Sequence, residues 1–357
     1  MQAEKSAGKR ILERKRMIME KEVSLSKLQS EIEKYSVTIV VAAYNCEKTI
    51  RHCIQSLLNQ TYKAIEIVII NDGSIDNTAE ICKTFCCNRI RYFDNSCNLG
   101  VSATRNQGID LAKGDLLIFV DSDDWVEKDY VYNLVSLMDK WTAMGICGFF
   151  YHNDIEKKPP EKYLYSIEGT VSILGKSDLY QLSHCWHYST LWNKIMWTHI
   201  IRNGGLHFEE KLSIGEDTRF ILQYINLFDE VKIKVLSKPM YHYVQSNKNS
   251  LWFTQTTQWR ETLKNAELLY NIVKESNVSK AEEYYLAECS QILQRQLYIN
   301  HGRKTSETKA VWDATEMIYE SFGRKLTPFS LMCKNARILW RKEYIYGKMQ
   351  FLRNLMK

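Results

Sequence analysis

The spacing of hydrophobic positions changes twice along the chain. Over residues 1–35 no proline interrupts the sequence, and apolar residues recur at every seventh position: Ile11, Ile18, Leu25 and Ile32. Such a heptad pattern predicts one long helix with an apolar seam. Short apolar runs then alternate with helical spacing, and from about residue 256 helical spacing continues alone. The pattern predicts an N-terminal helical extension (1–35), an α/β domain (36–250) and a helical C-terminal region (251–357).

The α/β domain is predicted from apolar runs of strand length that are separated by helical segments. Strands are expected at 37–43, 65–70, 90–93, 116–120, 145–151, 231–236 and 240–244. Helices are expected at 47–60, from about 76, and at 101–112, 130–138 and 216–228. This alternation predicts a Rossmann-like, mostly parallel sheet flanked by helices. Sheets of this class bind ligands at the carboxyl ends of their strands.

Acidic residues stand at two of those strand ends. Asp72 follows the strand 65–70, and Asp121-Ser122-Asp123 follows the strand 116–120. Alternate residues at a strand end can present two carboxylates on one side, and carboxylate oxygens are the ligands that Mg²⁺ and Mn²⁺ prefer. Acidic residues also begin helices, and Asp124 is a candidate cap for the next one.

Five stretches, taken in order, resemble the donor half of a family 2 glycosyltransferase with the GT-A fold. They are Ala42-Ala43-Tyr44-Asn45, Ser56-Leu-Leu-Asn-Gln-Thr-Tyr62, Glu66-Ile-Val-Ile-Ile-Asn-Asp-Gly-Ser74, Asn98-Leu-Gly-Val-Ser-Ala-Thr-Arg-Asn-Gln-Gly108 and Gly114-Asp-Leu-Leu-Ile-Phe-Val-Asp-Ser-Asp-Asp124. The later half resembles the family through Leu191-Trp-Asn-Lys194 and Gly215-Glu-Asp217. The resemblance divides the domain into a nucleotide-sugar half (36–125) and an acceptor half (126–250).

The resemblance implies a UDP-sugar donor held with Mn²⁺ or Mg²⁺. The residues it places on the donor are Ala42, Tyr44, Asn45, Asp72, Asn98, Gly100, Arg105, Asp121 and Ser122. It makes Asp123 the metal ligand, with His242 as a further candidate. Three other interpretations stay open: Tyr44 as core packing, Arg105 in a surface ion pair, and His242 as a buried histidine. The chain carries Asn71 where many members have a first Asp.

Glycosyl transfer needs a Lewis acid for the departing diphosphate and a carboxylate that accepts the proton of the incoming hydroxyl. The resemblance makes Asp217 that base, with Glu216 as the fallback. Acids at the start of a helix are also favourable through its dipole alone. Trp192, Asn193 and Lys194 are expected on the acceptor side. A base opposite the leaving group implies a single displacement with inversion.

The function that follows is an inverting hexosyl- or N-acetylhexosaminyltransferase. It would move a sugar from a UDP-sugar to a hydroxyl of a glycan or lipid-linked glycan in polysaccharide or cell-envelope synthesis. A nucleotide-sugar binding protein without turnover, or a nucleotidyltransferase, is the alternative. Glu216-Asp217 counts against the first alternative. A nucleotidyltransferase would carry a glycine-rich basic loop after the first strand, but in this chain Tyr44-Asn-Cys-Glu47 follows that strand.

The net charge of +6 is concentrated at the two ends of the chain. The basic amphipathic tail (329–357) favours an anionic membrane surface, or else a helix packed on the body. The heptad over 1–35 leaves self-association and docking on the same chain open. No nucleic-acid motif accompanies the charge, so no such partner is expected. Ten cysteines without metal-ligand spacing, and no signal-like or membrane-length apolar run, predict a cytoplasmic protein. The family resemblance and the basic tail add the expectation of a peripheral position at the inner face of the cell membrane.

Overall fold

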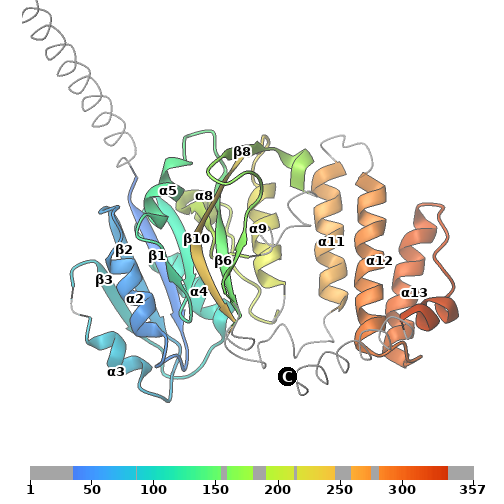
Figure 1. Ribbon diagram of the computed structural model, residues 1–357, viewed down its shortest axis with the longest axis horizontal. Helices are drawn as coiled ribbons and strands as arrows, with labels where there is room; N and C mark the ends of the chain where they lie inside the picture. The colour runs from blue at the N-terminus through green and yellow to red at the C-terminus, as the bar shows by residue number, and fades with distance from the viewer. Residues whose placement is uncertain are drawn as a thin grey trace, which may run out of the picture.

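The computed structural model describes residues 35–85, 87–153, 159–179, 190–212, 215–245, 259–274 and 281–336. The predicted N-terminal helix, apart from Tyr35, and the tail beyond Ala336 lie outside the described residues. Among the described residues, the chain folds into one mixed sheet covered by helices, with a row of further helices beside it (Figure 1).

The first half of the sheet is parallel, as the alternation of strands and helices predicts. It consists of β1 (Val37–Ala43), β2 (Ile65–Asn71), β3 (Ile90–Asp94) and β4 (Leu116–Asp121) in the order β3-β2-β1-β4. Because these strands run the same way, the polar residues that follow them meet at one edge of the sheet.

The second half of the sheet is mixed. The strand order continues as β9-β6-β10-β5, with β9 (Lys194–Trp197) antiparallel to both β4 and β6 (Met144–Asn153). Two predicted strands form one, β10 (Ile233–Gln245), because the ladder tolerates register shifts around Pro239, which has no N–H to donate. The short strands that were not predicted are β5 (Trp125–Val126), β7 (Glu161–Tyr163), β8 (Val171–Leu174) and β9.

Each face of the sheet has its own layer of helices. Val37, Ile39 and Val41 of β1 belong to one apolar cluster with α2 (Ile50–Leu58), α3 (Thr78–Lys83) and α5 (Tyr130–Ser136). The intervening Val40 belongs to a second cluster on the opposite face. That face is covered by α4 (Val101–Leu111), α8 (Thr198–Asn203) and α9 (Glu216–Asn226). A short 3-10 helix, η1 (Lys176–Asp178), follows β8.

Helix α4 lies unusually close to the central strand. A Cβ placed on Gly108 would come within 2.3 Å of Cγ1 of Val40, so any larger residue would push the helix away from β1. Glycine lowers helix propensity by about 1 kcal/mol relative to alanine, and its presence here is explained by this contact. The same helix carries Arg105, and the close packing therefore determines how far Arg105 stands from the sheet edge.

Among the described residues of the C-terminal region, three long helices stand side by side (Figure 1). They are α11 (Trp259–Lys274), α12 (Ala281–Ile299) and α13 (Ser306–Ser321). Leu263, Leu293 and Val311, one from each helix, belong to the same apolar cluster as Phe220 of α9. The core of the sheet domain thus continues through α9 and α11 into the C-terminal helices.

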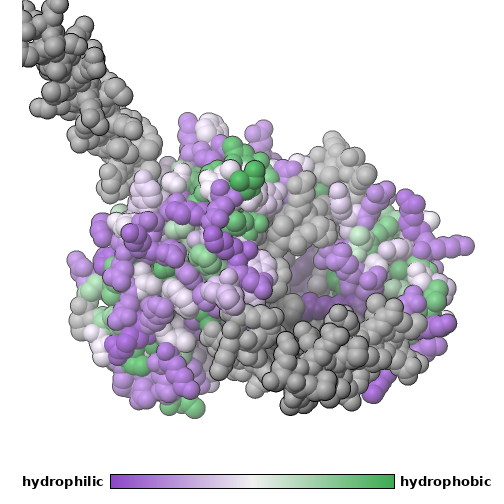
Figure 2. All heavy atoms as spheres, viewed as in Figure 1, coloured by the Kyte–Doolittle hydropathy of each residue, from purple (hydrophilic) through white to green (hydrophobic). Residues whose placement is uncertain are grey.

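The visible face of the molecule is mostly hydrophilic over the described residues, with apolar side chains grouped near β8 (Figure 2). Val171 and Ile173 of that edge strand are 49% and 64% exposed. Within the described parts of the chain, no helix combines the length and hydrophobicity that a bilayer span requires.

Candidate active site

Arg105 lies at the centre of a buried group of charges where the two halves of the domain meet. Its Nη2 is 3.0 Å from Oδ1 of Asp121, at the end of β4, and its Nη1 is 2.8 Å from Oδ1 of Asp217, in the first turn of α9. Oε1 of Glu216 is 3.6 Å from the same Nη1. The residue is 6% exposed. The surface ion pair considered for Arg105 is therefore wrong, because the pair is buried and joins segments 112 positions apart.

The charges of this group perturb one another. Burial alone would lower the pKa of Arg105, but the carboxylates of Asp217, Asp121 and Glu216 outweigh it and raise that pKa. Burial raises the pKa of Asp217, against the opposing effect of Arg105. Burial and the charge of Asp217 raise the pKa of Glu216 to about 7. A carboxyl group with such a pKa exchanges protons near neutral pH, as a general base must.

Asp124 fixes the acidic turn after β4. Its Oδ2 accepts a hydrogen bond from the hydroxyl of Tyr241 at 2.8 Å, and its Oδ1 accepts one from the N–H of Val244 at 2.8 Å. The Tyr241 hydroxyl in turn accepts from the N–H of Asp121 at 3.1 Å. The expectation that Asp124 caps the next helix is wrong, since α5 begins at Tyr130 after Asp129.

Asp123 differs from its neighbours in facing solvent. Although the residue is exposed on one side, the protein around it and the charge of Asp121 raise the pKa of its carboxyl to about 6. Among the described residues no other side chain donates a hydrogen bond to this carboxylate. An exposed carboxylate that is destabilised when charged suits a divalent cation, which prefers hard oxygen ligands and completes its shell with phosphate and water. Within the described residues, however, no group of three or more candidate ligands forms a ready-made metal site.

His242 lies in a stack of rings between β5 and β6. Its ring is 4.7 Å from that of Trp125 and 4.6 Å from that of Phe150, nearly parallel to both. Its Nε2 is 3.0 Å from Oε1 of Glu127, and its Nδ1 is 2.9 Å from Nε2 of His152. Both ring nitrogens thus have protein partners, so a metal ion at His242 would have to displace one of them.

Asp72 shapes the turn that precedes α4. Its carboxylate accepts hydrogen bonds from the N–H groups of Leu99 and Gly100, at 3.0 and 2.9 Å, and from Nδ2 of Asn95 at 3.0 Å. Oδ1 of Asn98 also accepts from the N–H of Gly100. Gly100 has φ +94°, a conformation that favours glycine. Asp72 is 3% exposed, and in this structure its carboxylate stabilises the turn from inside the protein.

The other donor-side candidates lie at the ends of β1 and β4. Ala42 pairs with Asp121, and Tyr44 is 45% exposed, so Tyr44 is not core packing. Asn45 has φ +48°, and its N–H donates to Oγ of Ser74 at 3.0 Å, which ties the β1 loop to the β2 loop. Ser122 hydrogen-bonds the thiol of Cys46.

The three residues expected on the acceptor side are buried. Trp192, Asn193 and Lys194 are 4%, 0% and 0% exposed. Trp192 stacks on Tyr241 at 4.2 Å, and Nζ of Lys194 donates to the Thr190 carbonyl and to Oδ1 of Asn193. Burial lowers the pKa of Lys194 to about 7. These three side chains are therefore part of the packing around the site and are not exposed on its surface.

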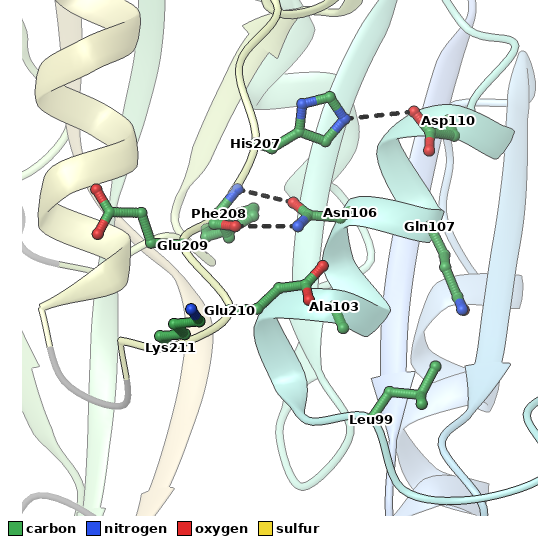
Figure 3. A pocket seen from close by; sticks show the side chains of 10 residues that line it. All are labelled: Leu99, Ala103, Asn106, Gln107, Asp110, His207, Phe208, Glu209, Glu210 and Lys211. Atoms are coloured by element: carbon green, nitrogen blue, oxygen red, sulfur yellow. Dashed lines mark hydrogen bonds and ion pairs between the residues drawn. The ribbon is translucent and has the colours of Figure 1, made fainter.

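The contact between Asn106 and Phe208 was not predicted from the sequence. The Asn106 side chain accepts from the N–H of Phe208 at 2.7 Å and donates to its carbonyl at 3.0 Å (Figure 3). This amide pair fixes the segment before α9 to α4, next to Arg105. A hollow of about 740 Å³ lies between α4 and residues 207–211 (Figure 3). Neither Arg105 nor Asp217 is among the described residues that line it, so it is separate from the carboxylate group.

Tyr241 was also missed. Its contacts to Asp121 and Asp124 join residues 120 and 117 positions apart. The one signal for it in the sequence was the alternation of aromatic residues around His242.

Comparison with known proteins agrees with this geometry. Residues 38–197 match the model of glycosyl transferase family 2. Glycosyltransferase GlyA of Streptococcus pneumoniae is 32% identical over 282 residues, which cover 76% of this chain and 39% of GlyA. The UDP-Glc:alpha-D-GlcNAc-diphosphoundecaprenol beta-1,3-glucosyltransferase WfaP of Escherichia coli is 39% identical over 103 residues, 29% of this chain and 41% of WfaP. The chain thus spans less than half of either relative.

The fold has solved counterparts. The crystal structure of S. aureus TarS 1-349 in complex with UDP superposes with a TM-score of 0.59 at 18% identity, covering 89% of this chain and 92% of that one. At this identity the likeness establishes the fold alone, which is the predicted GT-A fold. Through residues 38–197 and the relatives that share them, the chain belongs to glycosyl transferase family 2.

Proposed function

We propose that this chain is an inverting, metal-dependent glycosyltransferase that moves a sugar from a UDP-sugar to an acceptor hydroxyl. The observation that carries the proposal is the buried contact of Arg105 with Asp121 and Asp217. It brings the acidic turn after β4, the helix that follows the donor turn and the predicted base into one place. Asp72 joins the same arrangement through Gly100, the residue before α4.

The residues that fit a divalent ion are led by Asp123, the exposed carboxylate of the turn. An ion bound there would act as a Lewis acid on the departing diphosphate. Asp121 contributes negative charge beside Asp123 and is itself held by Arg105. The chain's own part is to orient the diphosphate, through the turn at Asn98–Gly100 and through the fixed guanidinium of Arg105.

Asp217 is the proposed base. Arg105 donates a hydrogen bond to its Oδ1 at 2.8 Å, which fixes the orientation of the carboxylate. Its side chain remains 19% exposed, which leaves room for an acceptor hydroxyl. Glu216, with its pKa raised to about 7, is the second candidate. A base on the face opposite the diphosphate gives a single displacement and inverts the anomeric centre.

The two alternative classes receive less support from the geometry. A binding protein without turnover has no need for two partly buried carboxyl groups with raised pKa values, since such groups reduce stability at neutral pH and are found mainly where they have a chemical task. A nucleotidyltransferase would need a basic, glycine-rich phosphate loop after β1. Here that loop carries Tyr44, Asn45 and Glu47, and Glu47 binds Asn77.

The acceptor that we propose is a glycan or a lipid-linked glycan of the cell envelope. The name of the relative WfaP includes a UDP-Glc donor and a diphosphoundecaprenol-linked acceptor. An acceptor of that kind is held at a membrane, which suits the basic tail predicted over 329–357 and a peripheral position at the inner face of the membrane.

The decisive experiment separates binding from turnover. We expect Asp217→Asn to reduce transfer at least about a thousandfold, because the amide cannot accept the proton. UDP affinity, measured by calorimetry with Mn²⁺, should change less than about threefold, since Asn keeps an oxygen near Arg105. The assay would screen several UDP-sugars for Mn²⁺-dependent hydrolysis and transfer.

Glu216→Gln is the matched variant, because Glu216 lies in the same turn at a longer distance from Arg105. Retained turnover in Asp217→Asn, together with loss in Glu216→Gln, would transfer the role of base to Glu216. Formation of UTP and a sugar 1-phosphate from a UDP-sugar and added pyrophosphate, with no release of UDP, would identify a nucleotidyltransferase.

A further inference from the structure

The first turn of α9 is also held from the side that faces away from the sheet. Gly215, the residue before Glu216, has φ +80°, and its carbonyl accepts hydrogen bonds from the N–H of Arg219 and from Nδ2 of Asn265, both at 3.0 Å. Asn265 belongs to α11 in the C-terminal region. A Cβ on Gly215 would lie 2.7 Å from that Nδ2, so the amide fills the space that a side chain would need.

Arg219 closes this arrangement into a ring. Its Nε donates to Oδ1 of Asn265 at 2.9 Å, so both ends of the Asn265 amide are used. Its Nη2 donates to Glu261 of α11 at 2.9 Å, and its Nη1 donates to Glu209, before α9, at 2.8 Å. Arg219 and Asn265 are 9% and 6% exposed. Buried polar groups with complete partners fix one geometry, because any other leaves a group unsatisfied.

The two arginines hold opposite sides of one helical turn. Successive residues of an α-helix are rotated by roughly 100°, so Asp217 and Arg219 point about 200° apart. Asp217 faces Arg105 of α4, and Arg219 faces α11. The orientation of the Gly215 peptide directs the chain into Glu216 and Asp217. It therefore depends on a residue from a helix that lies outside the α/β domain.

We infer that Asn265 and Arg219 are positioning residues, through which the C-terminal helix α11 orients the Glu216–Asp217 turn for the reaction. The inference rests on the proposed function. Asn265 touches neither Glu216 nor Asp217 among the hydrogen bonds of the described residues; it acts through the carbonyl of Gly215. The C-terminal helices are then part of the working enzyme as well as of its core.

Asn265→Asp tests the inference in the full-length protein. The carboxylate still accepts from Nε of Arg219 but has no N–H for the Gly215 carbonyl, so folding is retained while the turn is freed. We expect kcat to fall about tenfold or more, with Kd for UDP and Mn²⁺ changed less than about twofold. Asn265→Ala, which removes both bonds, should act in the same direction.

Leu269→Ala is the control, since it removes buried apolar packing from the same helix without touching Gly215. Hydrogen exchange of the peptide that contains residues 215–219 supplies a readout that does not depend on turnover. We expect faster exchange in the Asn265 variants and little change in Leu269→Ala.

The inference is overturned if Asn265→Asp keeps the wild-type kcat and exchange, or if kcat falls in all three variants in proportion to their loss of stability. If the wild-type protein transfers no sugar, the proposed function fails at the first step. Hydrogen exchange would then still decide whether Asn265 orders the turn.

Discussion

At the scale of single residues, the site is defined by how differently its carboxyl groups are placed. Asp124 is buried and accepts two hydrogen bonds, Asp121 is paired with Arg105, and Asp123 faces solvent beside them. Three acids within four positions thus have a structural, an ion-paired and an exposed role. Sequence alone does not separate these roles, because they depend on contacts made in the fold: Asp124 binds Tyr241 and Val244, more than a hundred positions away, and Asp121 pairs with Arg105 of α4.

The raised pKa of Asp123 predicts a pH-dependent stability. Its pKa is about 6 in the folded protein and about 3.9 when unfolded, so the folded state binds the proton more tightly. The contribution of protonated Asp123 to the free energy of unfolding is therefore complete below pH 4 and is lost as the pH rises through 6. In EDTA at pH 7.5, Asp123→Asn should therefore raise Tm by roughly 2 °C, equivalent to about 1 kcal/mol after allowance for solvent screening.

The same variant should lose the increase in Tm that Mn²⁺ gives the wild-type protein. Thermal unfolding at pH 4.5 and 7.5, with EDTA or Mn²⁺, measures both effects. Asp110→Asn is the control, because that carboxylate is 68% exposed and lies in the separate hollow. An undiminished Mn²⁺ effect in Asp123→Asn would place the metal elsewhere.

At the scale of elements, the turn before α4 connects the proposed donor site to the buried group of charges around Arg105. Asp72 holds the N–H groups of Leu99 and Gly100, and α4 then carries Arg105 one turn further on. The geometry of this turn depends on the positive φ of Gly100, where a residue with a Cβ would be strained.

A pair of glycine substitutions can separate strain from function. Gly100 (φ +94°) and Gly169 (φ +86°) both have nothing within 4 Å of an added Cβ. Alanine at either position should cost a similar amount of stability, about 1 kcal/mol. Only Gly100→Ala should also weaken UDP binding, by about tenfold, as measured by calorimetry with Mn²⁺. Equal UDP affinity in both variants would mean that the turn does not contact the donor.

At the scale of the whole molecule, the sheet domain and the C-terminal helices share one core. Met332, Cys333 and Ala336 still belong to the apolar cluster that contains Phe220 of α9. A chain that ends before these residues would expose apolar surface. The predicted membrane contact of the tail therefore has to be tested with a chain that ends no earlier than Ala336.

We expect full-length protein to float with vesicles that contain anionic phosphatidylserine, and less with neutral phosphatidylcholine vesicles. A chain that ends at Ala336 should float less with the anionic vesicles, since each basic residue near the surface contributes about 1 kcal/mol at low salt. Its unfolding transition should be unchanged. Equal flotation of the two proteins would show that the tail does not bind the membrane.

The sequence predicted the parts of the fold that repeat a strong local pattern. The strands β1 to β4, the helices α4 and α9 and the helical C-terminal region follow from apolar periodicity. The strands β5, β7 and β9 have two to four residues, too few for a periodic signal, and their pairing depends on distant partners. Arg105, Asp121 and Asp217 were predicted as site residues because their motifs resemble the family. The supporting contacts of Tyr241, Asn106 and Asn265 were not predicted, because each joins segments that are far apart in the sequence.

The contact between Gly108 and Val40 limits how the site can respond to a substrate. A helix whose glycine lies directly on the side chain of a sheet residue has little freedom to tilt or slide. Arg105 therefore stays at a fixed distance from the strand ends, and in the proposed enzyme it would hold a diphosphate of only one length. In the proposed enzyme, adjustment to donors of different size would then depend on the loops around the site. We expect the residues that discriminate among sugars to lie in those loops.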